Sequence, residues 1–221
     1  GGGRVTIDAG TGSLTIAPSG RVDSGETLEL VATGDVILTG PVGSVAAPNQ
    51  LNITSVIGTI QLPELTGNLK SSAGVALAAP RIFLDGTLTT TGATPAAGDF
   101  EIQINAAEVL RMTGQFNVAG SVQISAPAEF GLYNFTGSQT GNSSVWQIAA
   151  AGDLSFGRIV QDQDGRRRSE GVRIQGVNGL QAVAAGTLTV QAGAQLSVSG
   201  DDGRLRLSGE AVTVAGTLLG G

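Results

Sequence analysis

The chain has 221 residues, of which 41% are hydrophobic and only 14% are charged, and its formal net charge is -6. This composition excludes a disordered chain, because disorder combines low hydrophobicity with high charge, and the negative charge argues against nucleic acid as a partner. No apolar run approaches the roughly 18 to 20 residues that a membrane-spanning helix needs. The sequence therefore predicts a folded protein rich in β-structure.

Short segments that alternate apolar with small polar residues recur along the chain, and each ends at Gly, Pro, Asn or Asp. This pattern is typical of strands joined by turns. In chain order the expected strands are 4–8, 13–17, 27–32, 35–40, 50–55, 59–63, 74–79, 81–86, 87–92, 100–105, 115–120, 121–126, 145–150, 153–157 and 172–176, followed by a strand-rich end over 186–221. Residues 105–112 are the best helical candidate, and a strand with a turn explains them equally well.

The strands also recur with a longer period. The apolar residues that open each unit are Val5, Leu28, Leu51, Val75, Phe100, Val122, Val145, Val172, Leu188 and Leu205. Consecutive members of this series lie 16 to 27 residues apart, a range that indicates stacked repeats. Because the strands alternate, one side of the sheet is buried and the other faces solvent, unlike the strands of a doubly wound α/β sheet.

These observations predict an all-β fold, a parallel β-helix (β-solenoid) of roughly ten rungs that spans residues 1–221 as a single domain. A right-handed coil is favoured. At about 4.8 Å per strand, ten rungs would form a rod about 45 to 50 Å long. Because the chain opens with GGGRVTID and no Met, we expect it to be a segment of a longer or polymerising polypeptide.

The residue types needed for common catalytic sites are scarce. The chain contains no His and no Cys, which excludes Ser-His-Asp and Cys-His arrangements and histidine metal sites. Lys70, the single lysine, lacks the glycine frame of a phosphate-binding loop, and most acidic residues are scattered singly. We therefore expect no enzymatic activity, no cofactor and no metal centre.

The densest cluster of charges lies in QDQDGRRRSEG, residues 161–171. Its charged residues are Asp162, Asp164, Arg166, Arg167, Arg168 and Glu170. The carboxylates suggest a calcium loop, although the EF-hand register fails, and the arginines suggest a clamp for an acidic sugar or a carboxylate. The simpler interpretation is a solvated loop that protrudes from a rung, with charges that pair weakly.

A second unusual segment, residues 129–147, contains half of the eight aromatic residues. Aromatic rings can stack on sugars, so Tyr133 and Trp146 are candidate contacts with a glycan. The alternative is that the rings fill the interior of a widened rung, with the polar part of the segment as an exposed loop. Protruding loops are therefore expected near 129–147 and near 161–171.

Three segments carry a resemblance to a known family. They are ATGDVILTG (32–40), VAAGTLTVQAGAQLSVSG (183–200) and GRLRLSGEAVTVAGTL (203–218). These repeats resemble those of filamentous-haemagglutinin-like exoproteins and large bacterial adhesins. The resemblance implies a secreted bacterial protein, located extracellularly or at the cell surface, where such proteins form long stalks.

The leading functional hypothesis is therefore structural: an adhesin stalk or a head-to-tail filament subunit that mediates adhesion or builds cell-surface or biofilm architecture. An uncapped terminal strand invites another strand, so the expected partner is a second copy, or else the same polypeptide continues. The final segment carries no charge after Glu210, and the opening GGG carries none before Arg4, so neither end looks protected. The alternatives are a carbohydrate-binding module that uses rows of Thr and Ser to contact a glycan or host surface, and a β-helix enzyme that processes polysaccharide.

Overall fold

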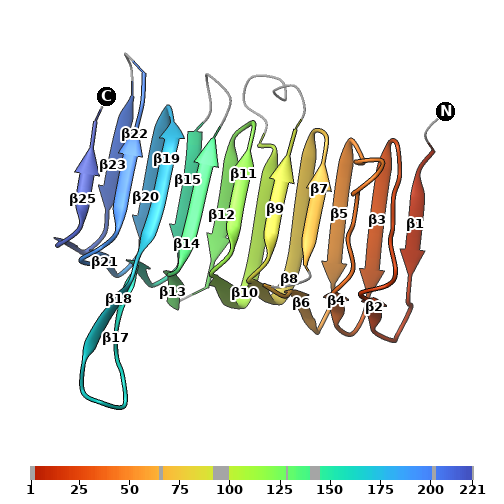
Figure 1. The fold of residues 1–221 in the computed structure, drawn as a ribbon, viewed down its shortest axis with the longest axis horizontal. Helices are drawn as coiled ribbons and strands as arrows, with labels where there is room; N and C mark the ends of the chain where they lie inside the picture. Colours follow the sequence, from red (N-terminus) through yellow and green to blue (C-terminus); the bar gives the residue numbers. More distant parts are fainter. Residues whose placement is uncertain are drawn as a thin grey trace.

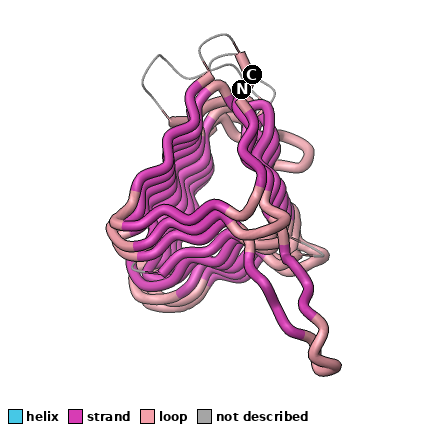
Figure 2. Tube along the Cα trace, turned by 90° about the vertical axis from the view of Figure 1, so that its left-hand side faces the viewer, coloured by secondary structure: helices cyan, strands magenta, loops and turns pink. Residues whose placement is uncertain are grey.

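The computed structural model describes residues 3–64, 67–91, 100–127, 129–139, 145–200 and 203–220. Within these residues the strands are parallel, apart from one hairpin, and stack into a rod with a triangular cross-section (Figures 1 and 2). The two termini lie at opposite ends of the rod (Figure 1). The all-β, parallel β-solenoid fold predicted from the sequence is confirmed.

The solenoid has three faces. The first face consists of β1 (Val5–Asp8), β3 (Thr27–Ala32), β5 (Gln50–Ser55), the first parts of β8 (Gly74–Leu84) and β10 (Ile102–Met112), β12 (Val122–Ala126), β15 (Val145–Ala150), β20 (Gly179–Ala184) and β23 (Arg204–Ser208). The second face consists of β2 (Leu14–Ile16), β4 (Val36–Leu38), β6 (Thr59–Leu62), the second parts of β8 and β10, β13 (Glu129–Leu132), β16 (Asp153–Phe156), β21 (Thr187–Val190) and β24 (Ala211–Val214).

The third face consists of β7 (Asn68–Ser71), β9 (Thr87–Thr90), β11 (Gln115–Val118), β14 (Phe135–Gln139), β19 (Val172–Val177), β22 (Gln195–Val198) and β25 (Thr217–Leu219). Single bridges from Val22 to Val42 and from Val42 to Leu69 continue this face toward the N-terminal end. The remaining strands, β17 (Arg158–Gln161) and β18 (Arg167–Glu170), form an antiparallel hairpin outside the rod. Among the residues described, no helix is long and apolar enough to cross a membrane.

The register of the first face corrects the predicted number of rungs. The stacked inward residues are Val5, Leu28, Leu51, Val75, Ile102, Val122, Trp146, Leu180 and Leu205. The predicted series was wrong at Phe100 and Val145, and it counted Val172 and Leu188 as two units. Those two residues belong to the third and second faces, because an inserted hairpin separates Trp146 from Leu180 by 34 residues (180 minus 146).

The rod is consequently shorter than predicted. Nine described strands stack on the first face, which corresponds to about eight turns. Eight spacings of about 4.8 Å give a length of about 38 Å, in place of the expected 45 to 50 Å. The right-handed sense of the coil stays a prediction.

Two long strands pass through a corner and connect the first and second faces. In β8, the residues up to Ala78 pair with β5, and those from Arg81 onward pair with β6. β10 follows the same course, with a register shift between Ala106 and Val109. The helical candidate at 105–112 is thus a bent strand, because pairing with β8 satisfies its backbone hydrogen bonds within the sheet.

The core is a continuous column of aliphatic side chains that alternate with solvent-facing residues. β3 and β5 show strict alternation of buried and half-buried positions, which is the period of two that a pleated strand imposes. The large side chains Phe116, Phe135 and Trp146 are packed in the same interior. Gly137 leaves room for the indole, since a Cβ there would lie 2.4 Å from the Trp146 ring.

Glycine at one corner is required by close contact between turns. A Cβ on Gly114 would lie 2.0 Å from the Gly86 carbonyl oxygen of the neighbouring turn. Gly131, on the outer side of β13, differs: a Cβ there would meet only ordinary contacts at 3.8 Å. The two positions therefore form a matched pair for testing how tightly the corners are packed.

We expect Gly114→Ala to lower the free energy of unfolding by about 1 to 3 kcal/mol, the usual effect of overpacking. Gly131→Ala should change it by less than about 0.5 kcal/mol, or raise it slightly, because alanine is less flexible than glycine in the unfolded chain. Urea unfolding followed by circular dichroism measures both. Equal losses for the two variants would contradict the steric explanation.

A buried carboxyl group lies at the corner between the third and first faces. Glu101 is only 1% exposed, and its two carboxylate oxygens have no hydrogen-bond partner of normal geometry among the described residues. Burial raises the pKa of Glu101, while the nearby Thr90 hydroxyl and Ala119 amide lower it to a smaller extent. Gly120 accommodates the group, because a Cβ there would overlap its Oε2 atom.

Because the folded pKa of Glu101 lies above the unfolded value of about 4.5, the folded state holds this proton more tightly, and stability falls as the pH rises from the unfolded to the folded pKa. We expect Glu101→Gln to raise the melting temperature at pH 7 by about 2 to 12 °C, because the amide removes the buried charge. A poorly satisfied buried group costs about 1 to 3 kcal/mol, and more when it is charged, and each kcal/mol shifts the midpoint by about 2 to 4 °C. The control is Glu108→Gln, at a side chain 61% exposed. A lower midpoint for Glu101→Gln would refute this interpretation.

Candidate functional site

The hairpin is the main departure of the described residues from the solenoid. It leaves the body after Gly157, which has a φ of 81°, and returns at Gly171, between the second and third faces (Figures 1 and 2). Arg158 pairs with Glu170, and Gln161 pairs with Arg167. The connection is therefore ordered by its own backbone ladder.

A tight turn closes the hairpin tip. The Asp162 amide donates to the Arg166 carbonyl oxygen over 2.8 Å, and the Gly165 amide donates to the Asp162 carbonyl oxygen over 2.9 Å. Gly165 has a φ of 77°, which glycine adopts easily. The side chains of Asp162, Asp164, Arg166 and Arg167 are all exposed there.

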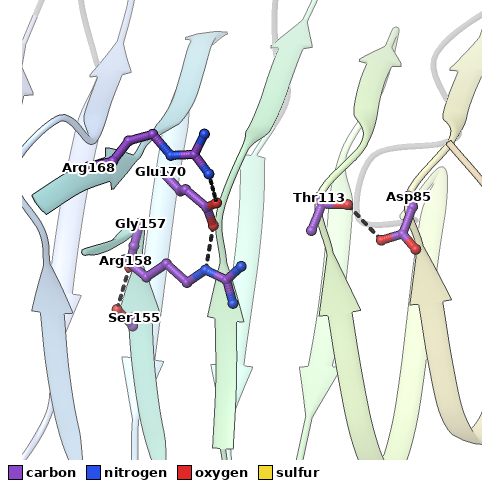
Figure 3. A network of polar contacts seen from close by, with 7 residues as sticks. All are labelled: Asp85, Thr113, Ser155, Gly157, Arg158, Arg168 and Glu170. Atoms are coloured by element: carbon purple, nitrogen blue, oxygen red, sulfur yellow. Dashed lines mark hydrogen bonds and ion pairs between the residues drawn. The ribbon is translucent and has the colours of Figure 1, made fainter. Parts of the chain in front are cut away.

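An ion-pair cluster holds the base of the hairpin against the rod. The Glu170 carboxylate, only 7% exposed, accepts a hydrogen bond from Arg158 Nε and a second, of 3.1 Å, from Arg168 Nη2 (Figure 3). The Arg158 guanidinium also lies 3.8 Å from the centre of the Tyr133 ring, a distance typical of a cation–π contact. These contacts join both hairpin strands to the loop after β13.

Further contacts fix the direction of the hairpin. Asn134, which has a φ of 50°, hydrogen-bonds to Glu170 through its side chain. Ser169 Oγ donates to the Ala192 carbonyl oxygen, and Ser155 Oγ donates to the Gly157 carbonyl oxygen over 2.8 Å (Figure 3). The hairpin is consequently tied to the turns on both sides of its own turn.

The structure brings together only part of the set that the sequence singled out. Tyr133, Arg168 and Glu170 meet at the hairpin base, whereas the four charged residues of the tip lie away from it, exposed to solvent. Arg158 and Asn134 complete the base and were missed. In the sequence, Arg158 could have been found from its position directly after Gly157, where the apolar–polar alternation of β16 ends.

Trp146 is part of the core. Its side chain is fully buried, and its ring centre lies 6.4 Å from that of Phe135, at an interplanar angle of 60°. Phe135 in turn contacts Phe116 edge-on at 5.2 Å. The interior interpretation therefore describes this aromatic group, with Tyr133 as the member that lies outside, against Arg158.

The calcium loop considered as an alternative for residues 161–171 does not form as one group. In the parts of the chain that the structure describes, no three His, Cys, Asp or Glu side chains gather in a way that could hold a metal ion. Glu170 is bound to two arginines at the hairpin base, while Asp162 and Asp164 lie at the tip. The arrangement supports a rigid projecting arm better than a cation site.

No family model, no curated protein and no solved structure matches the chain. The likeness of its repeats to filamentous-haemagglutinin-like proteins stays a prediction.

The hydrogen bond from Arg158 lowers the pKa of Glu170, against the opposing effect of burial. Because the folded pKa lies below the unfolded value of about 4.5, this contribution to stability is complete above that value and is lost as the pH falls through the folded pKa. We expect Glu170→Gln to speed hydrogen exchange of the hairpin amides about ten- to hundredfold at neutral pH, since hydrogen bonds to charged groups contribute about 1.5 to 3 kcal/mol.

The matched control is Asp164→Asn at the tip, which should leave hairpin exchange unchanged. The protection of the wild-type hairpin amides, measured relative to their intrinsic exchange rate at each pH, should fall in acid, and that fall should be absent from Glu170→Gln. Equal exchange rates in the wild type and Glu170→Gln at neutral pH would show that the ion pairs do not order the hairpin.

Proposed function

We propose that this chain is a structural β-solenoid segment of an extracellular bacterial surface protein, either part of an adhesin stalk or a subunit of a head-to-tail filament. Two features support the proposal: an uninterrupted parallel ladder along the rod and the resemblance of the repeats to those of large adhesins. The strongest support for the proposal is the apolar surface of the final turn.

The final turn exposes side chains at positions that are fully buried one turn earlier. Val212 and Val214 of β24 are 45% and 46% exposed, and Leu218 of β25 is 38% exposed. Their register partners one turn earlier are Leu188, Val190 and Leu196, and all three are fully buried. The surface is thus the same aliphatic column that forms the core.

The strand edges at this end are also free to pair. Within the described sheets β23, β24 and β25 each have one neighbour, which are β20, β21 and β22. An edge strand with apolar side chains is a template for another strand, and covering it removes apolar surface from water. A further turn of the same polypeptide or the β1 end of a second copy would complete the ladder.

Head-to-tail assembly is tested by electron microscopy and analytical ultracentrifugation over a concentration series. We expect the wild-type rods to join end to end, with an axial repeat of about 43 Å, which is nine strand spacings of about 4.8 Å. Val214→Glu places a charge on the apolar end and should block joining. Thr213→Glu, an outward position on the same strand, is the control and should still assemble.

Single rods of the wild-type chain at every concentration would contradict the filament subunit and leave the stalk segment, in which the same polypeptide continues. Assembly that persists in Val214→Glu would show that the contact lies elsewhere on the rod.

A further inference from the structure

An open groove of about 560 Å³ lies on the second face, across β13, β16 and β21. Its solvent-facing lining consists of Gly131, Asp153, Ser155, Thr187, Thr189 and Gln191. The volume is within the range of small-molecule binding sites, about 300 to 1,000 Å³. The groove is independent of the rod ends, because it lies on a lateral face.

The groove exists because small residues follow one another in a row of outward positions. Across successive turns this row is Phe83, Arg111, Gly131, Ser155, Thr189 and Thr213. Phe83 and Arg111 are bulky, and the Arg111 guanidinium lies 4.7 Å from the centre of the Phe83 ring, whereas neither lines the groove. From Gly131 onward the side chains are short, and the backbone forms the floor.

Tyr133 is not part of the groove lining, but it lies next to the floor at Gly131. A Cβ at Gly131 would lie 3.8 Å from the Tyr133 Cδ1 atom, so the ring stands beside the floor. Ser155, whose hydroxyl donates to the Gly157 carbonyl oxygen, joins the floor to the hairpin base (Figure 3). An aromatic ring beside hydroxyl groups is the combination that contacts the apolar faces and polar edges of a sugar.

The polar groups of the groove recur from turn to turn. Ser155 and Thr189 pair across β16 and β21, so the two residues are stacked one strand spacing, about 4.8 Å, apart along the rod axis. This spacing is close to the rise of one unit in an extended pyranose chain. Gln191 adds an amide, and Asp153, which already accepts a 2.7 Å hydrogen bond from the Thr187 amide, adds a carboxylate acceptor.

The charges around the groove favour a neutral ligand. The Arg111 guanidinium is paired with Asp85, with Nη2 at 2.5 Å from Oδ2, and Arg158 and Arg168 are paired with Glu170. Asp153 is the only charged residue among the described residues that line the groove. A carboxylate there accepts hydrogen bonds from sugar hydroxyls and repels an acidic polysaccharide.

From this geometry we propose that the groove binds a neutral oligosaccharide chain laid along the rod axis, with Ser155, Thr189, Gln191 and Asp153 bonding its hydroxyls and Tyr133 contacting a ring. The solenoid would then carry a glycan site on its side while its ends serve assembly.

The test screens the wild-type chain against a panel of linear neutral and acidic oligosaccharides of four to six units, followed by calorimetric titration with the best neutral binder. Gly131→Leu fills the floor of the groove and should weaken binding more than about tenfold. Thr189→Val removes one hydroxyl without a change of shape and should weaken it about three- to tenfold, the usual effect of one hydrogen bond. The control is Thr136→Val, an outward position of the third face, which should bind like the wild type.

Circular dichroism checks that each variant is folded, and if Gly131→Leu fails to fold, Thr189→Val decides. The proposal is overturned by a wild-type chain that binds no neutral oligosaccharide of the panel, by binding of acidic chains alone, or by unchanged affinity in Thr189→Val. Filament formation is measured separately, so a failure of end-to-end assembly leaves this result unaffected.

Discussion

The structure depends on one constraint: each turn must place its inward side chains directly over those of the turn before, at the spacing of a parallel β-ladder. A side chain in the middle of the rod, such as Ile53 or Leu77, is fully buried because turns lie on both sides of it. The constraint acts on the inward positions and on the corners where neighbouring turns touch. It leaves the outward positions free, and these carry nearly all the chemical variety of the chain.

The corners supply partners for some of the polar groups inside the rod. The Ser71 hydroxyl, which is fully buried, lies 2.8 Å from the carbonyl oxygens of both Pro48 and Gly74. The two buried glutamates differ in whether a charged partner is present. Glu170 has two arginines and its pKa is lowered, whereas Glu101 has no charged partner among the groups that shift it, and burial raises its pKa.

The sequence was sufficient to predict the fold because inward and outward residues alternate in almost every strand, as in β21 and β22. The number of turns could not be predicted, because the repeats differ in length and a hairpin inserted after Gly157 looks like part of another repeat. Residues 105–112 resembled a helix because a bulge between Ala106 and Val109 interrupts the alternation. The sequence singled out Tyr133, Arg168 and Glu170 as unusual residues. Their contact depends on how the hairpin folds back on the rod, and no local sequence pattern determines that.

The position of the hairpin has a wider consequence. Its two ends lie at one corner, where the Gly157 amide still donates to the Leu132 carbonyl oxygen over 2.6 Å and the Phe135 amide donates to the Gly171 carbonyl oxygen over 3.4 Å. The ladders on either side continue as though the insertion were absent. A corner of this kind separates the surface of the rod from its repeat: the hairpin adds an exposed, charged arm, while the turns on either side keep the hydrogen bonds that stack them.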